Sequence, residues 1–131
     1  MNQVAATPKW MTWVGWAMTA VPALMMGGMG TVMGVLQPKE AVEGFEKYGY
    51  DANLFRVLIG VEVASVVIYL VPQTSVLGAI LLTAYLGGAV ATHVRAGEAQ
   101  WFFPVIMGVL VWGGLFLRDA RIRALIPLNR K

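Results

Sequence analysis

Residues 54–94 read LFRVLIGVEVASVVIYLVPQTSVLGAILLTAYLGGAVATHV, and this stretch decides the fold. Arg56 and Glu62 are its only acidic or strongly basic residues. About 20 apolar residues cross a hydrocarbon layer of about 30 Å, so the stretch is long enough to cross it twice. Only the polar segment Pro72-Gln73-Thr74 interrupts it. We therefore predict two antiparallel transmembrane helices, at about 54–71 and 75–94, joined by a tight turn.

Two further apolar runs, at about 12–36 and 101–117, bring the predicted spans to four. The chain of 131 residues is 58% hydrophobic and 13% charged, whereas about 25% of a soluble domain is charged. Each run is apolar all round, without the polar face of a surface helix. The prediction is a single domain, 1–131, that forms an all-α integral membrane bundle of four transmembrane helices.

The first run begins like a secretory signal, because a basic residue, Lys9, precedes it and Ala20-Val-Pro-Ala23 resembles a cleavage site. The apolar run continues well past that point, to Leu36. We therefore expect a retained span with a kink at Pro22.

The connection Gln37–Asn53 is the only sizeable loop between predicted spans. Its apolar residues recur at helical spacing among charged ones, which predicts a short amphipathic helix on the outer membrane surface. Gly49 should end this helix, and Asp51 or Asn53 can cap the next span. The apolar residues concerned are Ala41, Val42, Phe45 and Tyr48.

Basic residues are more frequent on the side of the membrane that holds both ends of the chain, six against four. The positive-inside rule then places both termini in the cytoplasm. The basic segment after the fourth span should be a juxtamembrane helix that dips Ile122, Leu125 and Ile126 into the inner interface. Its charge suits anionic lipid headgroups and is too local for nucleic acid. The six basic residues are Lys9, Arg118, Arg121, Arg123, Arg130 and Lys131, and the four are Lys39, Lys47, Arg56 and Arg95.

Glu62 is the most informative residue, since an acid inside an apolar span is costly and needs a partner or a pathway. The tight turn places Tyr85 at the same height, so a Glu62–Tyr85 hydrogen bond is predicted, with Ser65 and Tyr69 on the same helical face as Glu62. No Lys or Arg reaches this depth, so we expect the carboxyl to be protonated. Either a structural hydrogen bond or a polar cavity for a ligand or a proton fits this pattern. Counting inward from the span ends brings Gly28, Met29, Gly108 and Val109 to the same level.

Small residues recur in the spans and allow close helix packing. Gly27, Gly30 and Gly34 share one side of the first span, and packing inside one bundle is favoured over a dimerisation face. Met25, Met29 and Met33 form a stripe that can fill gaps or bind Cu(I). The sequence has no cysteine and one histidine, His93, near Thr92 and Arg95, so no metal site is predicted and most hydrolase mechanisms are excluded.

Several segments together resemble the DoxX-like family of small bacterial membrane proteins. The resemblance covers nearly the whole chain and implies a four-helix protein of the bacterial inner membrane. It places Arg56, Glu62, Tyr85, Thr92 and His93 as the polar set, without a proven catalytic role. The segments are Phe45-Glu-Lys-Tyr-Gly-Tyr50, Arg56-Val-Leu-Ile-Gly-Val-Glu62, Val76-Leu-Gly-Ala-Ile-Leu-Leu-Thr-Ala-Tyr85, Leu86-Gly-Gly-Ala-Val-Ala-Thr-His93, Phe102-Phe-Pro104 and Trp112-Gly-Gly-Leu-Phe-Leu-Arg-Asp119.

Some relatives are associated with thiosulfate:quinone oxidoreduction or with membrane redox complexes, and many have no assigned activity. The first hypothesis is therefore a redox-associated membrane subunit that works with a quinone or a redox partner, with candidate site residues Glu62, Tyr85, Arg56, Ser65, Thr92 and His93. The alternative is a non-enzymatic module that binds a small molecule or lipid, or assists assembly of another membrane protein. Proton-coupled transport is weaker, because four spans would need oligomerisation to enclose a pathway. The sequence leaves catalysis and oligomeric state open.

Overall fold

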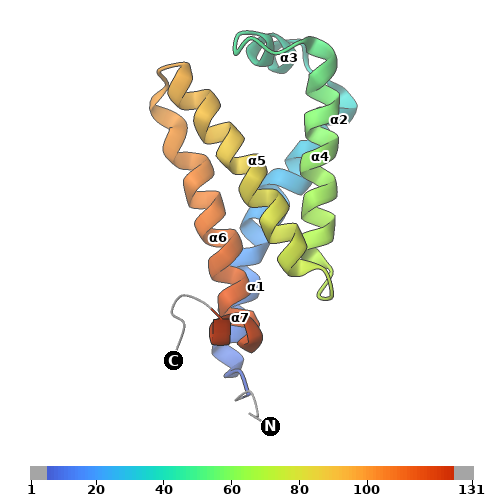
Figure 1. Cartoon of the computed structure of the whole chain (residues 1–131). Coiled ribbons are helices and arrows are strands. Elements are labelled where there is room, and N and C mark those ends of the chain that lie inside the picture. The colour runs from blue at the N-terminus through green and yellow to red at the C-terminus, as the bar shows by residue number, and fades with distance from the viewer. Residues whose placement is uncertain (1–5, 126–131) are drawn as a thin grey trace.

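The computed structural model describes residues 6–125, and all regular structure within them is helical (Figure 1). Four helices are long and apolar enough to cross a membrane: Lys9–Leu36, Ala52–Leu70, Ser75–Arg95 and Ala99–Arg118. Their bounds lie within three residues of the predicted spans. Large apolar side chains are exposed along every span, as expected for surfaces that face lipid tails. The four-span, all-α prediction is confirmed.

The first span is not one regular helix. It consists of α1 (Lys9–Pro22), the π-helical segment η1 (Ala23–Met29) and α2 (Gly30–Leu36). Pro22 has no N–H to donate and its ring crowds the preceding turn, and π-helical turns are one way to relieve such a defect. A kink was predicted at Pro22, and the structure has π-helical turns directly after it. α1 packs against α6, whereas η1 and α2 pack against α4.

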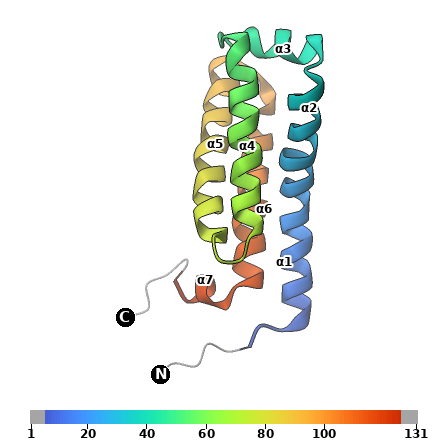
Figure 2. The same ribbon diagram turned by 90° about the vertical axis from the view of Figure 1, so that its right-hand side faces the viewer.

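The predicted amphipathic helix is α3 (Lys39–Glu46), which lies across the ends of α2 and α4 (Figure 2). Gly49 follows it with φ of 90°, a left-handed conformation that glycine adopts without strain. Asp51 caps α4 (Ala52–Leu70), because its Oδ1 accepts a 2.8 Å hydrogen bond from the Asn53 backbone N–H. The helix, the turn at Gly49 and the Asp51 cap are confirmed, whereas the outer position of the helix stays a prediction.

α5 (Ser75–Arg95) runs antiparallel to α4, and a 3₁₀ turn, η2 (Ala99–Trp101), leads into α6 (Phe102–Arg118). The short helix α7 (Ala120–Leu125) follows near the start of α1 and the α4–α5 turn (Figure 2). Ile122 is only 6% exposed and belongs to the protein core, so the expectation that it enters the lipid interface was wrong. Leu125 is exposed, while Ile126, Arg130 and Lys131 lie outside the described residues.

The core is densest in the half of the bundle nearest the α4–α5 turn. There Tyr69 is fully buried, donates its hydroxyl to the Val111 carbonyl at 2.6 Å and lies 3.2 Å from Thr19 Oγ1. The bonds join α4 to α6 and α1. Fully buried Leu82 and Val111 and nearly buried Leu115 surround this junction. This half of the molecule therefore holds α1, α4 and α6 together through buried hydrogen bonds.

Three glycines of the first span, Gly27, Gly30 and Gly34, face α4, as predicted for packing within one bundle. A Cβ added at Gly27 would lie 3.0 Å from Val66, and one at Gly34 would lie 2.9 Å from Ile59. At Gly30 the nearest atom to such a Cβ is Glu62 Oε2, at 3.4 Å. The Gly30–Gly34 pair is thus already used inside the chain.

Candidate functional site

A cavity of about 380 Å³ lies between α4 and α5, beneath the segment that contains α3. Figure 1 shows these two helices separating from their turn towards the end that α3 covers. The walls are aromatic on the loop side and are built from small residues along α5. The lining residues are Phe45, Tyr48, Tyr50, Leu58, Ala84, Tyr85, Gly88, Ala89, Thr92 and His93.

Tyr85 connects this cavity to the predicted mid-membrane acid. Its hydroxyl donates a 3.2 Å hydrogen bond to Glu62 Oε2, so the predicted Glu62–Tyr85 contact is present. Both side chains are partly buried. The antiparallel α4–α5 pair sets them at one height because their distances from the turn are similar. Tyr85, which lines the cavity, is therefore bonded to a carboxyl group that lies outside the lining.

In the first span, the residue that meets Glu62 differs from the one predicted for the middle layer. Gly30, rather than Gly28, faces Glu62, and Met29 is 56% exposed, so no thioether joins the polar pair. On the fourth span, Val109 is 62% exposed. Counting from the span ends assumed that they lie at equal depth, and the facing residues show an offset of about two residues, or 3 Å.

At the end of the cavity nearest the loop after α3, two hydroxyl groups face one another. Tyr50 Oη lies 2.7 Å from Thr92 Oγ1, and Thr92 also donates to the Gly88 carbonyl at 2.9 Å. Arg95 donates to the backbone carbonyl of Tyr48. These contacts hold the loop after α3 against α5, and they place predicted site residue Thr92 in the cavity wall.

His93 has a hydrogen-bond partner, Glu98, that was not predicted from the sequence. Its Nδ1 lies 2.6 Å from Glu98 Oε2, which also accepts a 2.8 Å hydrogen bond from the Tyr48 hydroxyl. Hydrogen bonding to His93, and then to Tyr48, lowers the pKa of Glu98 below its ordinary value. Burial, reinforced by the nearby Glu98 carboxylate, raises the pKa of Tyr48. The three side chains join the α3 loop, α5 and the α5–α6 loop.

Aromatic packing anchors the cover of the cavity. Phe45 of α3 stacks on Tyr50 at a centroid distance of 4.8 Å and packs edge-on against Phe55 of α4 at 5.5 Å. Tyr48 packs edge-on against the His93 ring at 5.7 Å. The spacing of Phe45 and Tyr48 predicted an amphipathic helix, but it gave no sign that these rings cover a cavity.

Two of the candidate site residues lie elsewhere. Arg56 is exposed near the start of α4, and among the described residues no hydrogen bond or ion pair joins it to Glu62. Ser65 is buried, but it donates to the Val61 carbonyl of its own helix at 2.7 Å and does not line the cavity. Ser65 lies on the same helix face as Glu62, as predicted, but one turn further along α4 this face is packed in the core and not in the cavity wall.

The sequence gives only a weak indication that Glu98 contacts His93. It follows His93 by five residues across Gly97, whose φ of 71° turns the chain back towards α5. Within residues 6–125, no three His, Cys, Asp or Glu side chains gather as metal ligands. Met25 and Met29 of the methionine stripe are exposed at 40% and 56%, on the lipid-facing surface.

The cavity and the Glu62–Tyr85 pair supply chemical groups that could bind a small molecule and hold a proton. An apolar and aromatic cavity with a few polar groups is typical of small-molecule sites, and its volume falls within their usual range of about 300–1,000 Å³. The Tyr85 hydroxyl and the Glu62 carboxyl form a short chain that can hold or relay one proton. Thr92 and Tyr50 offer further hydroxyl groups at the end nearest the loop after α3.

These features define a class: a multi-pass α-helical membrane protein with a cavity between two of its four spans. The model of the DoxX-like family matches residues 17–114, three quarters of the chain. The chain therefore belongs to the DoxX-like family. No curated protein and no solved structure matches it.

Proposed function

We propose that this protein is a redox-associated membrane subunit that binds a quinone headgroup in the cavity between α4 and α5. The observation that carries the proposal is the Tyr85–Glu62 pair at the wall of this cavity. We place the protein in the bacterial cytoplasmic membrane with both termini in the cytoplasm, which puts the cavity in the outer half of the bilayer. The family resemblance to quinone-linked relatives supports this assignment.

The cavity suits a flat, lipophilic ring. Its glycine and alanine residues leave a smooth wall on α5, and the rings of Phe45, Tyr48 and Tyr50 provide aromatic surface opposite. Aromatic pairs of this kind gain about 0.5–1.5 kcal/mol beyond their buried area. The surrounding span surfaces are apolar, so a prenyl tail can remain among the lipids.

The polar groups suit the carbonyl oxygens of such a ring. A quinone accepts two electrons and two protons. The single O–H of Tyr85 donates to Glu62 in the structure, so it must turn from Glu62 to donate to one carbonyl oxygen. Protonated Glu62 would then donate to the phenol oxygen and pass one proton through Tyr85 to the ring, and the second proton would come from water. Thr92 or Tyr50 can donate to the other carbonyl oxygen. The sequence has no cysteine and one histidine, so the electrons are expected to come from a partner protein.

Binding of menadione to the purified protein tests the site. We expect saturable binding to the wild type, weakened about two- to tenfold in Tyr85→Phe by loss of a hydrogen bond. Tyr69→Phe is the matched control, because it also removes one tyrosine hydroxyl, but from the packed core instead of the cavity lining. No saturable binding, or equal weakening by the two variants, would contradict the proposal.

Glu62→Gln separates proton handling from a structural role. The amide keeps a hydrogen-bonding partner for Tyr85 but carries no titrating proton, so menadione binding should persist. Quinone reduction in native membranes should fall about 100-fold, the usual scale of lost acid–base catalysis. Unchanged reduction would favour the alternative, a module that binds a small molecule or lipid, or assists assembly, without redox chemistry.

A further inference from the structure

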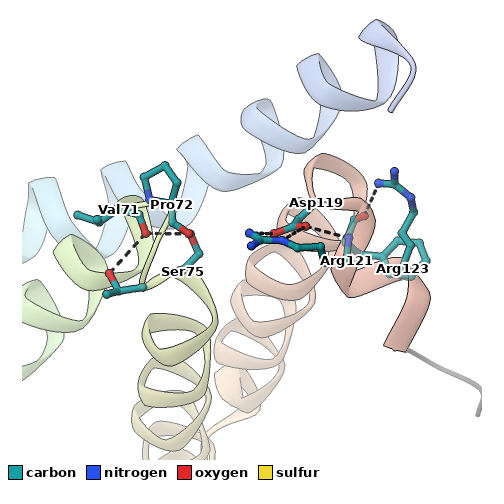
Figure 3. A network of polar contacts seen from close by, with 8 residues as sticks. Val71, Pro72, Ser75, Asp119, Arg121 and Arg123 are labelled. Atoms are coloured by element: carbon teal, nitrogen blue, oxygen red, sulfur yellow. Dashed lines mark hydrogen bonds and ion pairs between the residues drawn. The ribbon is translucent and has the colours of Figure 1, made fainter. Parts of the chain in front are cut away.

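A second cavity, of about 270 Å³, opens at the opposite end of the bundle, between α1, the α4–α5 turn and the α6–α7 junction. It shares no lining residue with the first. Figure 3 shows Ser75 and the turn on one side and the Asp119–Arg121 pair on the other. Its lining includes Trp16, Pro72, Ser75, Arg118, Asp119 and Arg121.

Arg118 is the unusual member of this lining. Its Nε and Nη2 atoms are buried and find no hydrogen-bond partner among the described residues. The guanidinium stacks on the Trp16 ring at 4.3 Å and lies 5.3 Å from the Tyr69 ring. Stacking occupies the faces of the group and fixes its plane, but only an acceptor in that plane can satisfy its N–H groups. A buried donor without an acceptor is destabilising, and one at a charged group more so.

The neighbouring polar groups do not meet this need. Asp119 is engaged by Arg121, whose Nε and Nη2 donate to its two oxygens at 3.1 Å and 2.9 Å. These bonds lower the pKa of Asp119, so it stays ionised and paired with Arg121. Ser75 donates its hydroxyl to the Val71 and Pro72 carbonyls at 3.0 Å and 3.3 Å (Figure 3). Among residues 6–125 the cavity thus has two guanidinium groups against one carboxylate, and none of these residues supplies an acceptor for Nε and Nη2 of Arg118.

The position of the cavity indicates the source of that acceptor. Trp10, Trp13 and Trp16 lie along α1 at this end and are 63%, 77% and 40% exposed. Tryptophan concentrates at the depth of lipid headgroups, where its ring sits between tails and water. The cavity therefore opens at the level where phosphate groups of lipids lie.

We propose that this cavity is an anion site in which Arg118, supported by Arg121, binds a phosphate group. The two sources of that chemistry are the headgroup of an anionic lipid and free inorganic phosphate. Arginine suits either, because its planar fork binds two oxygens of one phosphate at once. The site is separate from the quinone cavity and does not depend on it.

Native mass spectrometry of the purified protein with added phosphatidylglycerol, phosphatidylcholine or inorganic phosphate tests the site. We expect one phosphatidylglycerol per chain to bind preferentially over phosphatidylcholine. Arg118→Gln should weaken this binding at least about tenfold, as expected for lost hydrogen bonds to a charged group. Lys9→Gln is the matched control, since it removes an exposed positive charge from the same side, outside the cavity.

Arg121→Gln guards against a folding defect in Arg118→Gln, because the Arg121 side chain is 74% exposed. Its loss would release Asp119 to pair with Arg118, so it too should weaken binding. Preferential binding of inorganic phosphate, lost in both arginine variants, would support the site with a free anion as its ligand. Failure of both ligands to bind, or equal losses in Lys9→Gln and the arginine variants, would overturn the proposal.

Discussion

Gly78→Ala should be among the most damaging single-methyl changes in this protein. A Cβ at Gly78 of α5 would lie 2.6 Å from Tyr69 Cβ of α4 and closer still to the Tyr69 backbone N and Cα. To reach ordinary contact at 3.4 Å, the two helices must separate, because the obstructing atoms are backbone and cannot rotate away. Overpacking costs about 1–3 kcal/mol where side chains can adjust. We expect a loss at the upper end of this range or beyond.

Separation of the helices also has consequences away from Gly78. Tyr69 carries the hydrogen bond to Val111, and the Glu62–Tyr85 bond spans the same helix pair. Thermal unfolding in detergent, followed by circular dichroism, would measure the loss against Gly60→Ala. Gly60 has open space within 4 Å of an added Cβ, so that control should gain up to about 1 kcal/mol from helix propensity. Equal stability of Gly78→Ala and wild type would refute the close α4–α5 packing.

Three further predictions concern charge and topology. Thiol labelling of intact cells with an impermeant reagent should modify Glu43→Cys but not Lys9→Cys, and the reverse would invert the proposed orientation. At neutral pH, the infrared spectrum of the wild type should contain a protonated-carboxyl band that is absent from the spectrum of Glu62→Gln. The reason is that an unpaired carboxylate at mid-membrane is costly. Identical spectra would contradict this prediction. Because the pKa of Glu98 is lowered, its contacts with His93 and Tyr48 stabilise the fold fully above its ordinary pKa of 4.5. This stabilisation is lost as the pH falls through the lowered pKa. Melting temperature should therefore fall more steeply below that pH in wild type than in Glu98→Gln, and parallel profiles would count against the His93–Glu98 contact.

The fold could be predicted because the bilayer imposes it. Length and apolarity fix where spans begin and end, and a three-residue turn forces the second and third spans to be antiparallel. The Glu62–Tyr85 bond followed from this constraint alone. It needed only two positions at similar distances from Pro72-Gln73-Thr74, and it is present at 3.2 Å.

Contacts that depend on loops or on relative helix depth could not be predicted in this way. Glu98 reaches His93 because Gly97 turns the chain back, and no periodicity encodes that turn. The offset that brings Gly30 to Glu62, in place of Gly28, depends on how deeply the first span sits against α4. Ile122 was assigned to lipid because an apolar residue in a basic helix fits both an interface and a core.

The sizes of the residues on α5 explain why the cavity lies where it does. At the start of α5, Ser75, Gly78 and Ala79 are small and buried, and they let α5 touch α4 backbone to backbone. One to two turns later the residues are larger: Leu82 and Leu86 enter the core, and Tyr85 meets α4 through its hydrogen bond to Glu62. Beyond them the lining becomes small again with Gly88, Ala89 and Thr92, so the separation is not filled and remains as open volume. Tyr85 is therefore both the large residue between α4 and α5 where the cavity begins and a polar residue in the cavity lining. A change that removes its ring should therefore alter cavity shape, whereas Tyr85→Phe alters only its chemistry.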